Sequence, residues 1–521
     1  MKNIFALCVA AMLALPAMSH AGSATSRWDL SIGGQVKLDY FYADQSVNQD
    51  TPNAFRQGSG ANTSSIDKYG ATSWGAGESR LNFLVKGPDT WGARTSAFIE
   101  GDFSSLTSNS VSDSTRNNVE NYGLFYLRHA YMKFEWPTFT VVAGQTWSIP
   151  GNLPSFVLLG ANENGSFNRG ILVPEIYGVW QATKTFSITG GIQSPYPVSN
   201  WPGGTLSSGQ TIDDGFQRSN LPLFFGELNY RTDALGKIGA LMLQVGVGGI
   251  WGQEKPISPP AFGPVGDINS GQTYLVPTAL ATAGNQGTIS PGSNTVFAGF
   301  GPGNSVQYWS YNGYDSNTVN AWMLTFKSFI PIVPEKAPGK QAHSLGVGLA
   351  AFTGQDMTIF AGNSYYKQGV LAYDRTGYAF RSGADGYIAY NTQPNPNANF
   401  VAPVNTGGWV QLMYHWTDTL WSGFYYGQNR VSLSNARKGN QYGFATTQST
   451  ISSNAIEREE EYHVNLIYDP NPAIRLGIEY SYYSTHYGKN LYNIATINGV
   501  PSGLTSGGSV NTVRFSAIYF F

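Results

Sequence analysis

Apolar and polar residues alternate along much of the chain, in stretches of about ten residues. One such stretch runs from Leu30 to Tyr42. One set of its alternate positions is apolar: Leu30, Ile32, Val36, Leu38, Tyr40 and Tyr42. The other set includes Ser31, Gln35, Lys37 and Asp39. Neighbouring residues of a β-strand point to opposite faces, whereas a helix would need a period of 3.6, so the pattern predicts a strand with one polar face.

Strands of this kind are predicted along the whole chain, at 28–43, 78–87, 92–103, 122–135, 138–147, 170–181, 184–194, 219–231, 239–252, 318–331, 342–353, 407–415, 419–430, 459–468, 474–486 and 511–521. Short connections alternate with long ones, which are 44–77, 104–121, 195–218, 254–317, 354–406 and 431–458. A soluble β-sandwich also alternates in polarity, but not in loop length. We therefore predict an all-β fold, a transmembrane antiparallel barrel of about 16 strands with short periplasmic turns and long extracellular loops.

The composition agrees with a membrane barrel. Charged residues are 12% of the 521 residues, 14% are aromatic and 62 are glycine. The charged share is about half that of an ordinary soluble domain. Beyond the N-terminal segment the chain has no apolar run of about 18 residues, which a transmembrane helix requires. A membrane protein without such helices must pair its backbone groups in a closed barrel.

The N-terminal segment 1–21 resembles a secretory signal peptide. It has Lys2, an apolar run, and small residues at Ser19 and Ala21. We expect cleavage after Ala21 and a single barrel domain over 22–521. Cys8 is the one cysteine, so the mature chain would have no disulfide and no thiol chemistry. The full chain has a net charge of −2, and loss of Lys2 makes it −3, which gives no indication of nucleic-acid binding.

The chain ends in the strand-like sequence "NTVRFSAIYFF". We predict that this strand pairs with the first one and closes the barrel. Tyr519 and Phe521 would then lie in the periplasmic aromatic girdle. A terminal phenylalanine after such a strand also resembles the signal that the outer-membrane assembly machinery recognises. An ordinary apolar C-terminal strand is the alternative.

Enzyme motifs are missing or weak. The chain has no G-x-S-x-G, H-E-x-x-H or Walker sequence. The sequence "GVGLAA" at 346–351 lies within a predicted strand and is explained by small wall residues. The histidines after residue 21 show no metal-ligand spacing. We expect no cofactor, no metal and no enzyme activity, although a serine–histidine pair formed across strands stays open as an alternative.

A barrel of sixteen strands leaves an aqueous channel, and charges on its inner face set ion preference. The alternation places seven basic and four acidic candidates on that face: Lys37, Asp39, Arg80, Lys86, Arg94, Glu100, Asp102, Arg128, Arg475, Glu479 and Arg514. The basic excess predicts a weak to moderate preference for anions. Some of these charges could instead lie near the rims or pair with one another.

Two consecutive segments carry a resemblance to a known family. "ESRLNFLVKGPDTWGARTSAFIEGDF" and "LRHAYMKFEWPTFTVVAGQTW" resemble the early strands of Gram-negative trimeric porins. They are most similar to the DcaP-like branch, which is associated with dicarboxylates and other small anions. The resemblance implies a homotrimer, a basic ladder at the constriction that includes Arg80 and Arg128, and a third loop folded into the channel. The helical N-terminal extension of some members of this branch is absent here.

The segment in the place of the third loop runs from Ser148 to Arg169. Its apolar patch, 156–159, would be costly on an exposed loop, so we predict that the patch attaches the loop to the inner wall. A plain surface loop is the alternative. Glu163 would add an acidic group and Arg169 a basic one. Pro174, early in the next strand, predicts a bulge or an edge facing the loop.

These features together predict an outer-membrane porin for passive diffusion of small hydrophilic solutes, embedded among lipids and lipopolysaccharide. Its selectivity would come from the third loop and from the candidates Arg80, Arg94, Arg128, Arg169, Glu100, Asp102 and Glu163. A substrate-specific channel, for example for dicarboxylates, would instead carry stacked aromatic residues or a saturable site in the lumen. A barrel enzyme would lose hydrolysis on substitution of one serine or histidine. A sheath for an electron-transfer protein would co-purify with a haem protein.

Overall fold

A computed structural model describes residues 28–44, 70–105, 124–150, 172–195, 221–254, 319–355, 404–432, 456–487 and 507–521, together with Leu159 and short strands in the long connections. The predicted signal segment 1–21 and the candidates Glu163 and Arg169 lie outside the described residues. Among the described residues, no helix is long and apolar enough to cross a membrane.

The described barrel residues form one antiparallel sheet. Its strands are β1 (Asp29–Ala43), β5 (Ala71–Gly75), β6 (Arg80–Lys86), β7 (Arg94–Ser105), β8 (Leu124–Glu135), β9 (Phe139–Trp147), β10 (Leu172–Gln181), β11 (Phe186–Gln193), β12 (Leu223–Ile238), β13 (Leu241–Glu254), β16 (Val319–Val333), β17 (Leu345–Gln355), β22 (Val404–His415), β23 (Leu420–Ser432), β24 (Ile456–Asn471), β25 (Ile474–Tyr487) and β27 (Gly507–Phe520). β5 and β6 both pair with β1, each later strand pairs with the next one of the ring along the chain, and β27 pairs with β1, so the ring is closed.

The sheet has 17 strands, but β5 and β6 both pair with the same side of β1 and together occupy one place in the ring. The ring therefore has the sixteen places that the sequence predicts. One difference from the sequence prediction lies in β5, because residues 71–75 belong to the wall and not to the long loop 44–77. Several wall strands also extend beyond their predicted ends, as β12 does to Ile238. Between β5 and β6, residues 76–79 lie opposite the three residues 36–38 of β1, which is one extra residue and hence a β-bulge.

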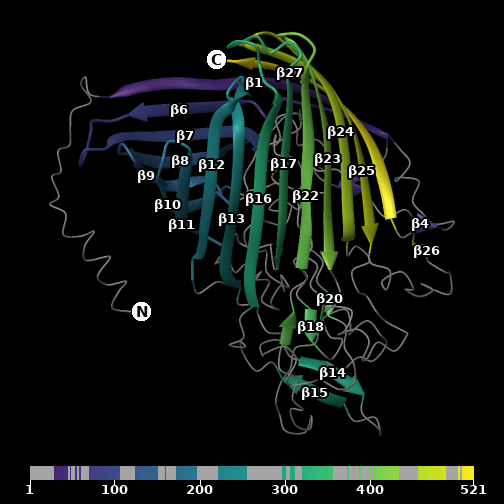
Figure 1. The fold of residues 1–521 in the computed structure, drawn as a ribbon. Helices are drawn as coiled ribbons and strands as arrows, with labels where there is room; N and C mark the ends of the chain where they lie inside the picture. The colour runs from purple at the N-terminus through teal and green to yellow at the C-terminus, as the bar shows by residue number, and fades with distance from the viewer. Residues whose placement is uncertain are drawn as a thin grey trace.

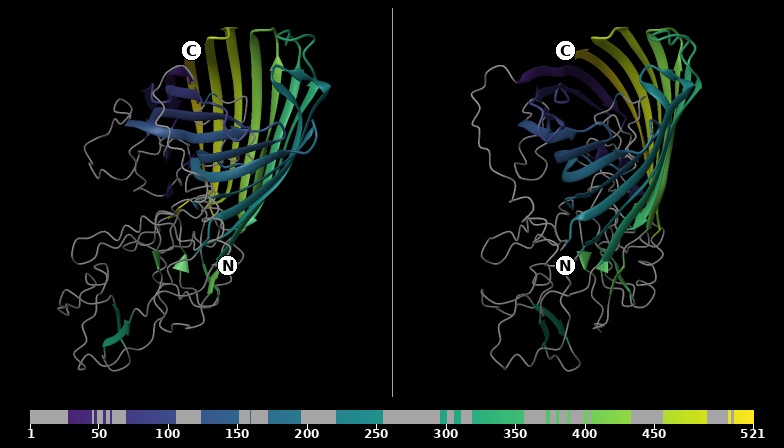
Figure 2. Two further views of the ribbon diagram at one scale, coloured as in Figure 1. Left: turned by 90° about the vertical axis from the view of Figure 1, so that its left-hand side faces the viewer. Right: turned by 60° about the vertical axis from the view of Figure 1, so that its left-hand side comes forward.

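The strands of opposite walls cross at a steep angle. Figure 1 shows β6 to β11 on one side and β16 to β25 on the other, and the two turned views in Figure 2 show the same crossing. Strands that tilt relative to the axis of a closed barrel cross in this way from one wall to the other. The expected bulge at Pro174 is not present, since β10 pairs with β9 without a register shift.

Short strands occur within the long connections. They are β2 (Val47–Asn48), β3 (Asn53–Ala54), β4 (Gly58–Ser59), β14 (Val296–Phe300), β15 (Val306–Ser310), β18 (Ala372–Asp374), β19 (Ala379–Phe380), β20 (Tyr387–Ile388), β21 (Asn399–Val401) and β26 (Gly503–Leu504). None of them pairs with a strand of the ring. The sequence "GVGLAA" lies within β17, as predicted.

The outer face of the ring is apolar and exposed. On β1 the side chains of Ile32, Val36 and Leu38 are about half exposed, whereas Lys37 and Asp39, which point to the opposite face, are buried. On β25 Leu476, Ile478 and Tyr480 are exposed and Glu479 is buried. Because a membrane protein turns its apolar face to lipid, the exposed set marks the outside and the buried set marks the lumen.

The C-terminal strand closes the ring as predicted. Val36 of β1 lies opposite Tyr519 of β27, and Gly34 and Phe521 exchange two backbone hydrogen bonds of 3.0 and 3.1 Å. Tyr519 and Phe521 are more than half exposed, at the end of the barrel that carries the short turns. This position agrees with the expected aromatic girdle.

Candidate channel lumen and constriction

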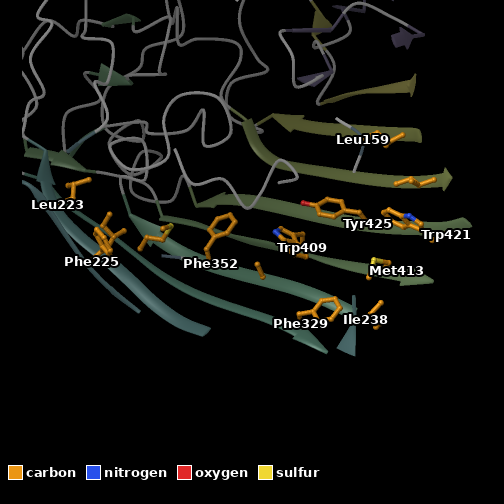
Figure 3. Packing of buried hydrophobic residues seen from close by; sticks show 14 of the residues in the cluster. Leu159, Leu223, Phe225, Ile238, Phe329, Phe352, Trp409, Met413, Trp421 and Tyr425 are labelled. Atoms are coloured by element: carbon orange, nitrogen blue, oxygen red, sulfur yellow. The ribbon is translucent and has the colours of Figure 1, made fainter. Parts of the chain in front are cut away.

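The inner face carries both charged and apolar side chains. Its buried charged residues are Lys37, Asp39, Asp102, Arg128, Glu175, Glu227, Lys327, Glu461 and Glu479. Its buried apolar residues come mainly from β12 to β24, and Figure 3 shows them on one face of neighbouring strands, with Trp409 and Tyr425 next to each other. The rings of this pair are 5.6 Å apart. The lumen is therefore amphipathic.

Arg128 lies at an irregularity of the wall. The register between β7 and β8 shifts between Glu100 and Gly101, and Arg128 is the residue of β8 left without a direct partner. Its guanidinium donates to the Glu100 carboxylate at 3.1 Å and to the Asp102 carboxylate at 2.7 Å, and lies over the ring of Trp147. A bulge re-aims a side chain in this way, and here it gives one cation two carboxylate partners.

The other predicted site residues divide into two groups. Arg80 lies directly opposite Asp102 on the neighbouring strand, so it joins Glu100, Asp102 and Arg128 in one patch of the wall. Arg94 lies exposed at the start of β7, opposite Glu135 and next to the short turn 87–93. The structure therefore brings four candidates together and leaves Arg94 at the rim. Glu163 and Arg169 lie outside the described residues.

A second charged group lies where the ring closes. Lys37 of β1 contacts Asp39 at 3.2 Å and forms a short ion pair with Glu78, which lies in the bulge between β5 and β6. Arg514 of β27 lies 3.5 Å from both Asp39 and Glu78, and Ser516 donates to Asp39. The sequence prediction did not include Glu78, although alternation from Arg80 places it on the same face of the predicted strand 78–87.

Leu159 attaches the segment between β9 and β10 to this closure. Its backbone N–H donates to Glu479 of β25 at 2.9 Å, and its carbonyl accepts from Lys37 of β1 at 2.7 Å. The side chain is 3% exposed and lies over Gly477, where an added Cβ would come within 2.6 Å of Leu159 Cδ1. β9 and β1 are separated by three strands of the ring, so Leu159 lies against a part of the inner wall that does not adjoin β9. The predicted attachment of the patch 156–159 is confirmed at Leu159.

A third group surrounds His463 on β24. Its Nδ1 lies 2.7 Å from the Ser481 hydroxyl, and its Nε2 lies 3.4 Å from the Glu461 carboxylate. All three side chains are buried. This is the serine–histidine pair across strands that the sequence left open. The backbone of Ser481 pairs with both β24 and β27, so it offers no spare N–H group for an oxyanion hole.

An ion pair also spans the far wall. Lys327 of β16 reaches Glu227 of β12 at 2.7 Å, across the intervening strand β13. Gly246 of β13 makes this possible, because an added Cβ there would come within 2.7 Å of the Lys327 side chain. In the part of the chain that the structure describes, no group of three or more His, Cys, Asp or Glu residues could hold a metal ion.

Comparison with solved structures shows the fold. The outer membrane channel DcaP of Acinetobacter baumannii matches over 96% of this chain and 99% of its own, at 14% identity and a TM-score of 0.54. The anion-selective porin from Comamonas acidovorans matches over 95% and 100%, at 8% identity and a TM-score of 0.44. Pseudomonas putida OprB matches over 95% and 94%, at 10% identity and a TM-score of 0.41. The latter two scores are too low to carry an argument.

No protein-family model matches the chain, and no curated protein sequence matches it. The resemblance of the two early segments to porins is confirmed at the level of the fold, by the structure of DcaP at 14% identity. The chain has the sixteen-stranded barrel fold of an outer-membrane channel.

Proposed function

We propose that the protein is an outer-membrane porin, a water-filled channel through which small hydrophilic solutes and ions diffuse passively. The observation that supports this most directly is the contact of Leu159 with Lys37 and Glu479. A residue between β9 and β10 that is held on the inner wall at β1 and β25 supports a third loop that narrows the channel. The barrel itself needs no cofactor for this function. Outer-membrane lipids and lipopolysaccharide would surround its apolar face.

The sign of the ion preference remains to be tested. The sequence predicts a weak to moderate preference for anions. Among the described inner-face residues that are buried, three are basic and six are acidic, without counting histidines. Arg128 is bonded to two carboxylates, and Lys37 and Lys327 each have a carboxylate partner. These charges weigh against the predicted sign, because a negative lumen favours cations.

The test is the current through single channels of the refolded protein in a planar bilayer under a KCl gradient. Steady openings support the porin, and the reversal potential gives the preferred ion. A reversal potential on the chloride side would support the prediction from sequence, whereas one on the potassium side would support the carboxylate excess. Folded, inserted protein that passes no current would refute the proposed channel. We further propose a homotrimer, which cross-linking in membranes would test.

Two observations support other functions. The Trp409 and Tyr425 rings on the inner face favour a substrate-specific channel, which would show current block that saturates with solute concentration. The contacts among Ser481, His463 and Glu461 are those of a hydrolase triad, although Ser481 offers no spare backbone N–H for an oxyanion. Hydrolysis of a p-nitrophenyl ester by the refolded protein, lost in Ser481→Ala, would support an esterase. Equal background hydrolysis in both proteins would exclude it.

A further inference from the structure

Two buried polar side chains of the inner wall, Glu175 and Gln193, are neighbours but form no hydrogen bond with each other. Glu175 of β10 and Gln193 of β11 lie directly opposite each other in register. Glu175 is 3% exposed and Gln193 is 1% exposed. Within the described part of the chain, both carboxylate oxygens of Glu175 and both the amide oxygen and nitrogen of Gln193 are without a hydrogen-bond partner. Buried polar groups nearly always have partners, so four such atoms on adjacent side chains point to a missing ligand.

Apolar neighbours surround Glu175, so its carboxylate has lost hydration that no hydrogen bond from the described residues replaces. Val173, two residues before Glu175 on the same face, is buried, and so is Leu223, which lies opposite Gln193 on β12. A carboxylate among apolar neighbours loses its hydration and gains nothing in return. By contrast, Glu227 on the same wall has Lys327 at 2.7 Å. Glu175 lies on the same inner face as Glu227, but no ion pair joins it to a cation among the described residues.

Two aromatic rings lie on the same inner face, next to Glu175 and Gln193. Tyr177 of β10 and Phe225 of β12 both lie opposite Gly191 of β11, and their ring centroids are 6.2 Å apart. Gly191 leaves space for them, because an added Cβ would come within 2.5 Å of the Tyr177 side chain. The faces of aromatic rings attract cations. A carboxylate, a carboxamide and two aromatic rings therefore lie together, and each of these groups can bind a cation.

We propose that Glu175, Gln193, Tyr177 and Phe225 form a lumen site for an organic cation that bears an ammonium group. The ammonium supplies the charge and the donors that Glu175 lacks, Gln193 accepts a further hydrogen bond, and the rings cover the adjoining carbon chain. A metal ion fits less well, because the described residues contain no group of three metal-ligating side chains. This inference rests on the proposed channel and names a solute class for it.

The experiment measures block of single-channel KCl current by butylammonium, with butanoate at the same concentration as the anionic counterpart. We expect butylammonium to interrupt the current and butanoate not to. One charge-assisted hydrogen bond contributes about 1.5–3 kcal/mol, so Glu175→Gln should raise the blocking concentration at least about tenfold. The matched control is Glu227→Gln, which alters a carboxylate that already has its cation and should change the block less than about twofold.

A second variant and a second measurement separate the possible failures. Gln193→Ala should also weaken block, while leaving the charge unchanged. Calorimetric binding of butylammonium to the folded protein in detergent does not require an open channel. Binding that depends on Glu175 without any current would uphold the site and refute the channel. Current with block that is equal in wild type and Glu175→Gln, or stronger block by butanoate, would refute the site and uphold the channel.

Discussion

Leu159→Ala tests whether the inward segment is held by the contacts described above. The leucine side chain is 3% exposed and packs over Gly477. Full burial of a leucine contributes about 1.5–3 kcal/mol, and truncation to alanine removes most of it, about 2 kcal/mol. Since 1.4 kcal/mol is a factor of about ten, the ratio of attached to detached segment should fall about 30-fold.

The truncation leaves the backbone of residue 159 in place. The hydrogen bonds to Lys37 and Glu479 can therefore still form, and each involves a charged group, which gives about 1.5–3 kcal/mol. The segment should stay attached most of the time but detach more often. The mean conductance should change little, whereas brief increases of current should become about 30-fold more frequent.

Single-channel recording at high bandwidth measures these events directly. The matched control is Leu228→Ala, which truncates a leucine of β12 that faces outward and is 50% exposed. It should leave the current noise as in the wild type. If Leu159→Ala folds, conducts and shows wild-type noise, the side chain of Leu159 does not hold the segment and the attachment inferred from its burial is wrong.

Three further changes test the charged contacts. Arg128→Ala removes a positive charge that contacts two carboxylates, so the reversal potential should move toward potassium; no movement would contradict the pairing. Lys327→Met isolates buried Glu227 and should lower the free energy of unfolding by about 3–5 kcal/mol, and adding Glu227→Gln should restore part of it in guanidinium titrations. Asp418, in the turn 416–419, accepts from the Ala342 backbone N–H, which lowers its pKa. Its stabilisation should be present above the unfolded pKa of about 4 and lost below it, so wild type and Asp418→Asn should differ at neutral pH and converge in acid.

The ring of strands could be predicted from the sequence because its signal is local. Each strand has a lipid face and a lumen face, so apolar and polar residues alternate over segments of about ten residues. The same alternation in the first and last strands predicted that they pair and close the barrel, and Gly34 and Phe521 do form backbone hydrogen bonds. β5 was missed because residues 71–75 are short and the bulge separates them from β6.

The lumen contacts were harder to predict because periodicity gives the face of a residue and not its depth. Arg94 and Glu100 share a face of β7, yet Arg94 lies exposed at the rim while Glu100 bonds Arg128. The ion pair of Lys327 and Glu227 crosses an entire strand and depends on a glycine between them. Arg128 was a candidate both from the alternation and from the family resemblance, but its two carboxylate partners depend on a register shift that the sequence does not show.

The position of the Leu159 contacts sets an order of events during assembly. Lys37 belongs to the first strand of the ring and Glu479 to the last but one, and β27 lies between those two strands. The binding place for Leu159 therefore does not exist until both ends of the chain have met. A barrel that is still open at this junction would have an untethered inner segment and a wider opening. Narrowing of the passage is thus a late step, and the current noise of a newly inserted barrel would report when its first and last strands have joined.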